Sequence, residues 1–339
     1  MIDEVNKLLI AVDAAGGEYA PREVVKGAIE AVKEFPIDIA LVGNKTVLEM
    51  LLRRSARKSN ITIVQASQVV MDGEEPIQAV QDKPDASVVV GVRLVKDDIA
   101  DGFVSAGSTG AIVVASFLNL GIVKGIERIA SCVVFEPTQP NPTLLIDIGV
   151  NPNCKPIFLV QFAQLANILA ERVFGIKSPR VALLNNGAEE IKGNTLAKET
   201  HQLLKKTALN FVGNVEGFDV LRGEADIIVM DGFTGNVLIK TIEGYSEVIQ
   251  KLLELQEASD LDRQLTGAAL AQYVQMVSAI KKLDYKEVGG AFLLGVNGNV
   301  VIAHGRSRAK AIKSAIHLAY LAARQGVIEA IKNGKYASE

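Results

Sequence analysis

Short runs of β-branched and apolar residues alternate with longer segments of helical periodicity along most of the chain. Such apolar runs are typical of buried strands, and the helical segments are typical of crossovers that join parallel strands. The expected strands are 8–12, 37–42, 61–64, 103–106, 132–135, 144–148, 181–184, 227–230 and 300–303. The expected helices are 21–35, 45–58, 111–120, 155–174, 195–206 and 308–324, and 87–95 fits either type. This order predicts an α/β fold with a mostly parallel, helix-covered sheet.

Two of the expected strands end in junctions that are typical of phosphate sites. The segment 226–236 reads Asp-Ile-Ile-Val-Met-Asp-Gly-Phe-Thr-Gly-Asn, and the segment 101–110 reads Asp-Gly-Phe-Val-Ser-Ala-Gly-Ser-Thr-Gly. Each leads into a helical pattern. Glycine lets the backbone approach a ligand, and the first amides of a helix have no partner within the helix. Because such junctions bind anions at the carboxyl ends of strands, the pair predicts a phosphate-handling enzyme.

Composition narrows the classes of function. The 339 residues can bury a large core, and the formal net charge of −3 provides no basic stripe for nucleic acid. Two cysteines, Cys132 and Cys154, cannot build a disulfide framework, so we expect a reduced, cytoplasmic setting. The charged segment 1–7 has no signal-peptide pattern. The uncharged run 102–123 could span a bilayer by length, but its glycines and hydroxyl residues favour a strand, a turn and a buried helix.

One long segment departs from the alternation of strands and helices. Residues 234–283 show no strand pattern, so we expect a helical hairpin inserted in a single α/β domain that covers 1–339. Its apolar positions, among them Leu252, Leu265 and Leu270, follow helical spacing. Such a stripe packs on the body of the protein, on a partner subunit or on a membrane surface.

Several common catalytic motifs are absent from the chain. The glycines never occur as Gly-x-Gly, and the Walker pattern, the Gly-x-Ser-x-Gly pattern and a His/Cys metal cluster are missing. The three histidines, His201, His304 and His317, leave little material for a catalytic triad. We therefore expect the bound phosphate to act as the nucleophile on an acyl carbonyl. Catalysis would then depend on orientation and on stabilisation of the oxyanion.

Eight blocks of sequence resemble the signature blocks of the PlsX family, the phosphate acyltransferases of bacterial phospholipid synthesis. The blocks are Ala11–Gly17, Ser105–Gly110, Asp147–Asn151, Leu183–Asn194, Gly213–Gly217, Asp231–Asn236, Gly289–Gly295 and His304–Gly305. They keep the order of the family over nearly the whole chain. The chain departs from the residues common in the family at Ser108, Val150, Asn186, Ala188 and Phe292. These departures bear on acyl preference and rate more than on the type of reaction.

The resemblance implies transfer of a long-chain fatty acyl group from an acyl-carrier-protein thioester to inorganic phosphate. The product would be an acyl phosphate for a membrane acyltransferase, formed without a metal or a nucleotide cofactor. The implied fold is a three-layer α/β/α Rossmann-like sandwich, similar to isocitrate and isopropylmalate dehydrogenases. The implied state is a cytoplasmic homodimer with peripheral membrane contact. Two alternatives stay open: a short-chain phosphotransacetylase that acts on coenzyme A thioesters, and a non-catalytic scaffold of a lipid pathway.

Three residues of these blocks are the predicted catalytic groups. Lys192 is the expected cation for phosphate or the developing oxyanion, with a solvated surface lysine as the alternative. Asn236 would orient phosphate or the thioester carbonyl, and it could also act as a simple helix cap. His304 would protonate the leaving thiolate, and a hydrogen-bonded structural histidine is equally compatible with the sequence.

The remaining predicted site residues bind phosphate or organise the site. The expected phosphate-binding residues are Ser105, Gly107, Ser108, Thr109, Gly110, Asn151, Asn194, Gly232, Thr234 and Gly235. Asp13, Asp147 and Asp231 follow or end strands. As bare anions they would repel phosphate, so we expect them to fix Lys192 or the loops around the site.

Overall fold

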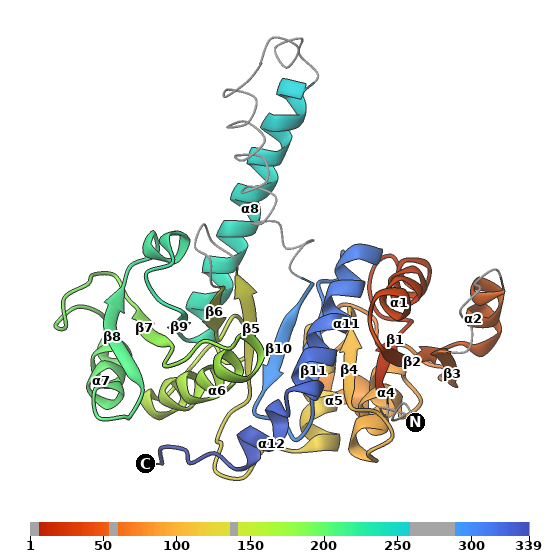
Figure 1. The fold of residues 1–339 in the computed structure, drawn as a ribbon, viewed down its shortest axis with the longest axis horizontal. Coiled ribbons are helices and arrows are strands. Elements are labelled where there is room, and N and C mark those ends of the chain that lie inside the picture. Colours follow the sequence, from red (N-terminus) through yellow and green to blue (C-terminus); the bar gives the residue numbers. More distant parts are fainter. Residues whose placement is uncertain (1–6, 54–59, 136–141, 258–288, 339) are drawn as a thin grey trace, which may run out of the picture.

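The computed structural model describes residues 7–53, 60–135, 142–257 and 289–338. Eleven strands form one continuous sheet in the order β3-β2-β1-β4-β11-β10-β5-β6-β9-β7-β8, with helices on both faces (Figure 1). The predicted α/β class with a mostly parallel sheet is confirmed. The uncharged run 102–123 contains a strand and a helix joined by a short turn, as predicted.

The elements of the fold follow one another as strands with intervening helices. The strands are β1 (Leu8–Asp13), β2 (Ile37–Gly43), β3 (Ile61–Gln65), β4 (Gly102–Ser105), β5 (Ala130–Phe135), β6 (Thr143–Ile146), β7 (Arg180–Leu184), β8 (Asn210–Val215), β9 (Ile227–Val229), β10 (Ala291–Leu294) and β11 (Val300–Ile302). The α-helices are α1 (Arg22–Glu34), α2 (Lys45–Leu52), α3 (Pro76–Asp82), α4 (Ser87–Lys96), α5 (Thr109–Leu120), α6 (Pro156–Phe174), α7 (Thr195–Leu204), α8 (Gly232–Glu257), α11 (Ala309–Arg324) and α12 (Val327–Lys332).

The centre of the sheet departs from the parallel pattern. Strand β10 pairs antiparallel with both β11 and β5, and β5 pairs antiparallel with β6. The other pairs within the sheet are parallel. Two parallel blocks, β3-β2-β1-β4-β11 and β6-β9-β7-β8, therefore run in opposite directions on either side of the two central strands. Strands β8 and β10 were not among the strands expected from the sequence.

Helix α6 is a long, largely apolar helix of the core. It is the one helix in the described part of the chain that is long and apolar enough to cross a membrane, and most of it is buried in the protein. Phe162, Leu165 and Leu169 on this helix are fully buried, and the helix packs on β6 and β9. Burial of most of the helix in the protein explains its apolar composition, as in other core helices.

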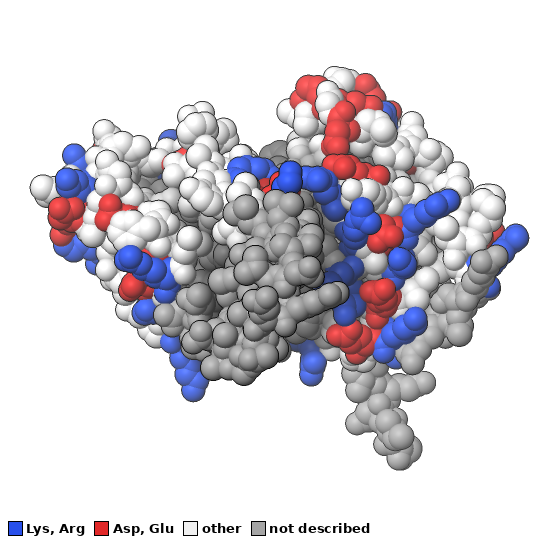
Figure 2. All heavy atoms as spheres, turned by 90° about the horizontal axis from the view of Figure 1, so that it is seen from above, with Lys and Arg blue, Asp and Glu red and all other residues white. Residues whose placement is uncertain are grey.

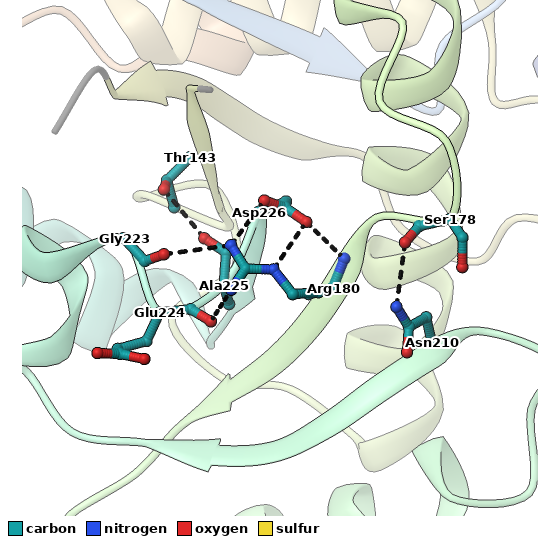
Figure 3. A network of polar contacts seen from close by, with 8 residues as sticks. All are labelled: Thr143, Ser178, Arg180, Asn210, Gly223, Glu224, Ala225 and Asp226. Atoms are coloured by element: carbon teal, nitrogen blue, oxygen red, sulfur yellow. Dashed lines mark hydrogen bonds and ion pairs between the residues drawn. The ribbon is translucent and has the colours of Figure 1, made fainter. Parts of the chain in front are cut away.

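A polar network ties together the amino ends of β7, β9 and β6 (Figure 3). The guanidinium of Arg180 donates from Nη2 to Oδ1 of Asp226 (3.0 Å) and from Nε to Oδ2 (3.2 Å), and from Nη1 to the carbonyl of Glu224 (2.9 Å). The Thr143 hydroxyl donates to the carbonyl of Ala225 (3.0 Å). The hydrogen bond with Asp226 raises the pKa of Arg180. The network fixes the amino ends of these strands. The loops that carry the predicted site residues follow the carboxyl ends of the same strands, on the opposite edge of the sheet.

Helix α8 projects from the body of the protein beside the centre of the sheet (Figure 1). It covers the first part of the segment 234–283, where the sequence predicts a helical hairpin. The rest of the segment, with Leu265 and Leu270, lies outside the described residues, so the hairpin stays a prediction.

Candidate active site

The first predicted phosphate junction, between β4 and α5, is open. Ser108 occupies the N-cap position of α5, and its side chain makes no capping hydrogen bond. The amides at the start of α5, those of Thr109 and Gly110, have no partner within the helix. Both residues line a cavity of about 450 Å³, named cavity 1. Helix amides that open into a cavity are a suitable site for an anion such as phosphate.

The second predicted phosphate junction, between β9 and α8, is already occupied by the carboxylate of Asp231. Oδ1 of Asp231 accepts the N–H of Thr234 (2.9 Å), and Oδ2 accepts its hydroxyl (2.7 Å). The N–H of Gly232 donates to the carbonyl of Asn151 (2.8 Å). An added anion at this turn would face the capping carboxylate, which repels it. The start of α5 is therefore the better anion site of the two.

Asp13 holds the loop after β1 against the end of β4. Its Oδ1 accepts the N–H groups of Ala15 and Gly16, each at 3.0 Å, and its Oδ2 accepts the Ser105 hydroxyl at 2.7 Å. The Ser105 oxygen in turn accepts the N–H of Gly107 at 3.0 Å. Ser105 and Gly107, both predicted phosphate ligands, thus use these groups within the protein. They shape the junction next to cavity 1.

Asp147 organises the loop that follows β6. It is fully buried, and its Oδ1 accepts the N–H (3.1 Å) and hydroxyl (2.7 Å) of Ser131 and the N–H groups of Gly149 (3.2 Å) and Val150 (3.1 Å). Its Oδ2 accepts the N–H (2.7 Å) and Nδ2 (2.8 Å) of Asn151. Nδ2 of Asn151 also donates to the carbonyl just before β5 (2.7 Å). The donors of Asn151, a predicted phosphate ligand, are therefore engaged inside the protein.

Cavity 1 brings two of the predicted catalytic residues to one place. Asn236 and His304 both line it, together with Thr109 and Gly110. Most of its wall is apolar and is formed by Val113, Val133, Val134, Phe135, Ile148, Val150, Ile239, Ile242, Ala291, Ile302 and Ala303. The cavity therefore places an apolar wall beside the first amides of α5, and apolar walls favour apolar ligands.

Lys240 and Glu243 also line cavity 1 and were not predicted from the sequence. They form an ion pair of 2.7 Å, with 54% of the Lys240 side chain exposed. They stand four and seven residues after Asn236, the spacing that places residues on one face of a helix. A helical wheel of the segment after Asn236 would have revealed them. Figure 2 views the face from which α8 projects, where further Lys and Arg side chains lie among acidic ones.

His304 is half-buried at the end of β11. Its Nδ1 accepts the N–H of Arg306 at 3.1 Å, so in the neutral ring the hydrogen lies on Nε2. Burial lowers the pKa of His304; Glu243 raises it, whereas Lys240 and Arg306 lower it further. The ring is therefore neutral at pH 7, and it would lose its bond from Arg306 if Nδ1 were protonated.

Three of the other predicted residues lie across α8, at a second cavity of about 530 Å³, named cavity 2. Asn194, Asp231 and Thr234 line it, and Asn194 also caps α7 by accepting the N–H of Ala197 (2.8 Å). Lys192 is exposed on the neighbouring loop and lines neither cavity. The predicted site residues are thus divided between two sides of one helix. Within the described residues, no group of His, Cys, Asp or Glu is arranged to hold a metal ion.

A continuous sheet with helices on both faces defines the fold class of the chain. Two solved structures share this fold: the EutD phosphotransacetylase from Staphylococcus aureus (TM-score 0.60, 17% identity, 94% of each chain) and a branched-chain phosphotransacylase from Enterococcus faecalis (TM-score 0.56, 14% identity, 93% of this chain and 99% of that one). At such low identity, these similarities establish the fold alone.

Sequence comparison identifies the family. The chain matches the family described as "Fatty acid synthesis protein" over residues 8–330. It is 46% identical over 320 residues to the phosphate acyltransferase of Dehalococcoides mccartyi, covering 94% of this chain and 92% of the relative. It is 48% identical over 312 residues to that of Dictyoglomus thermophilum, covering 91% and 92%. The chain therefore belongs to this family, the PlsX-type phosphate acyltransferases, and it is an acyltransferase of fatty acid and phospholipid synthesis.

Proposed function

We propose that the enzyme transfers a long-chain fatty acyl group from an acyl-carrier-protein thioester to inorganic phosphate in cavity 1. The observation that carries the proposal is the open start of α5 beside an apolar cavity. The amides of Thr109 and Gly110 would hold phosphate oxygens, and the acyl chain would lie along the apolar wall. Lys240 would add a positive charge next to the same anion.

The reaction needs one bond to form and one to break. An oxygen of phosphate would attack the thioester carbonyl, the C–O bond would form, and the C–S bond would break with the electron pair leaving on sulfur. Asn236 would orient the carbonyl or the phosphate from the wall of cavity 1. Holding both reactants in place and stabilising the oxyanion would supply most of the rate acceleration. Lys192, exposed on the loop between β7 and α7, lines neither cavity and stays a prediction from the sequence.

The setting of the enzyme completes the proposal. We place the enzyme in the cytoplasm as a homodimer that contacts the membrane peripherally, where a membrane acyltransferase would take up the acyl phosphate. The support is the family resemblance together with the exposed apolar residues Phe233, Tyr245 and Val248 on α8. Exposed apolar side chains along a projecting helix are suited to contact with a subunit or a lipid surface.

The direct test is to trap the product with hydroxylamine. Pure protein is incubated with palmitoyl carrier protein and phosphate, and formation of palmitoyl hydroxamate is measured. Hydroxamate formation that requires phosphate would support the proposal. No hydroxamate from any long-chain thioester would refute it, and turnover restricted to short coenzyme A thioesters would favour the phosphotransacetylase alternative.

A matched pair of lysine variants tests the assignment of cavity 1. Lys240→Met should raise the KM for phosphate about tenfold, because it removes one charge-assisted interaction with the anion. Lys251→Met is the control, since Lys251 is also exposed on α8, three turns further along the same face, and lines neither cavity. Equal KM values for phosphate in the two variants would remove Lys240 from the site.

A further inference from the structure

Helix α8 forms a wall shared by the two cavities. The residues that face cavity 2 are Thr234, Val237, Leu238 and Thr241, and those that face cavity 1 are Asn236, Ile239, Lys240 and Glu243. Each set has the spacing i, i+3, i+4, i+7, and the sets are offset by two residues. At about 100° per residue this offset places them on opposite faces of the helix. One element therefore belongs to both cavities, and a ligand on one side lies next to the other.

Cavity 2 combines an apolar floor with an amide-rich rim. Leu159, Leu183 and Met230 at its floor are each at most 2% exposed. Asn186 and Asn194 place side-chain amides at its rim, where the oxygen of Asn194 also accepts the N–H of Ala197. The amide of Asn185 is used within the protein, by the N–H of Asn186 (2.8 Å) and the carbonyl of Lys192 (3.2 Å). Amide groups pair with amide groups of a ligand through donor and acceptor together, whereas they offer no charge to a bare anion. The carboxylate of Asp231 also lines the cavity, is engaged by Thr234 and repels an anion, so the lining suits an uncharged chain that carries both amide and methyl groups.

The two cavities are close enough for one extended molecule to reach both. Asn236 faces cavity 1 and the next residue, Val237, faces cavity 2. On a helix of about 10 Å diameter, a step of about 100° corresponds to an arc of roughly 9 Å. The ridge crossed by this arc is apolar and open to solvent, with Phe233 66% exposed and Val237 52% exposed.

We propose that cavity 2 binds the pantetheine arm that carries the acyl thioester. This inference rests on the proposed acyl transfer in cavity 1. The arm contains two amides and a dimethyl carbon, and its backbone, about as long as four extended residues, reaches roughly 14 Å. With the thioester at Asn236, the arm crosses the ridge of α8 and enters cavity 2. Coenzyme A and a carrier protein present the same arm, so the site recognises the chemistry that the two donors share.

A variant that fills cavity 2 tests the proposal. Thr241→Trp places a bulky side chain in the cavity from an exposed position on α8, where the Thr241 hydroxyl donates to the carbonyl of Val237 (2.7 Å). Lys251→Trp is the control, because Lys251 is exposed on the same helix and lines neither cavity. Both proteins and the parent are assayed with palmitoyl-coenzyme A, palmitoyl carrier protein and palmitoyl-N-acetylcysteamine, which ends after the first amide.

The readout is the ratio of kcat/KM for each full-arm donor to kcat/KM for the truncated donor. Thr241→Trp should lower this ratio about tenfold for both full-arm donors, since loss of well-packed contacts in a pocket changes discrimination by this order. Lys251→Trp should leave it unchanged. An unchanged ratio in Thr241→Trp, or a loss confined to the carrier protein, would overturn the assignment of cavity 2 to the arm. If the proposed acyl transfer itself were wrong, the parent would form no acyl phosphate from any donor, which is a different result.

Discussion

The carboxylate of Asp147 accepts six hydrogen bonds, so replacing it with an amide has a calculable effect. In Asp147→Asn, one of the two carboxylate oxygens becomes an NH₂ group that can no longer accept. Oδ1 receives four donors, from Ser131, Gly149 and Val150, and Oδ2 receives two, both from Asn151. The amide will turn so that its NH₂ group takes the place of Oδ2. The two donors of Asn151 then face another donor inside the protein.

The magnitude follows from the bonds lost. A hydrogen bond to a charged group contributes about 1.5–3 kcal/mol, so loss of the two bonds from Asn151 should lower the free energy of unfolding by about 4 kcal/mol. Asp13→Asn is the matched control. Its Oδ1 receives two backbone N–H groups and its Oδ2 only the Ser105 hydroxyl. Because a hydroxyl can accept as well as donate, we expect a loss of about 2 kcal/mol there.

Urea denaturation followed by circular dichroism measures both effects. With a slope near 3 kcal/mol per molar urea, the midpoint should fall by about 1.3 M in Asp147→Asn and about 0.7 M in Asp13→Asn, at unchanged slope. Cavity 1 should be affected as well in Asp147→Asn, because Gly149 and Val150 line it. If the two variants lost equal stability, the count of donors on each oxygen would not be the cause, and the reasoning would fail.

Two further predictions concern glycines of α8 and the histidine of cavity 1. A Cβ on Gly235 would lie 1.9 Å from the carbonyl oxygen of Asp147, whereas one on Gly244 would meet nothing within 4 Å. Gly235→Ala should therefore lower the free energy of unfolding by about 3 kcal/mol, and Gly244→Ala should raise it by about 1 kcal/mol. Midpoints that shift in the same direction would contradict this. Burial lowers the pKa of His304 in the folded protein. Below about pH 6.5 the unfolded chain therefore binds more protons than the folded protein does. The free energy of unfolding should then fall as the pH drops from about 6.5 towards the lower pKa of the folded state. In His304→Asn, the amide oxygen can accept the Arg306 N–H, and the melting temperature should fall less between pH 7 and 5 than it does in the parent protein. An identical fall in the two proteins would show that His304 is not the cause of the pH dependence.

Much of the fold could be predicted from periodicity, and the exceptions have physical causes. The apolar runs that became β1, β2 and β9 are bounded by turn residues and are too short for helices. The segment of α4 is rich in valine and fits a strand as well; in the fold, Gly91 lets this helix pack against the ring of Phe103. Strand β8 contains Gly213 and alternates weakly, and β10 is four residues long. Their pairing depends on partners far away in the sequence, which local patterns do not report.

The sequence could predict which types of residue stand around the candidate site, but it could not predict which of these residues lie together at one cavity. The glycine-rich junctions and the block from 183 to 194 mark surfaces that line the two cavities. The sequence does not show that Asp231 caps its own helix or that Asn151 uses its donors within the protein, because both facts depend on side-chain orientation. Nor does it show that α8 separates Asn194 from Asn236. That separation depends on how the loops of the two parallel blocks meet.

The antiparallel pairing at the centre of the sheet explains why residues from both parallel blocks line cavity 1. In a parallel sheet, ligands bind at the carboxyl ends of the strands. Here the ends of β4 and β11 supply Thr109 and His304 from one block, and the ends of β6 and β9 supply Gly149 and Asn236 from the other. The central strands β5 and β10 run between these two ends and contribute their own side chains, among them Val133, to the floor of the cavity. The rule of carboxyl ends therefore holds for each block separately, and the antiparallel centre joins two half-sites into one cavity large enough for both an anion and an apolar chain.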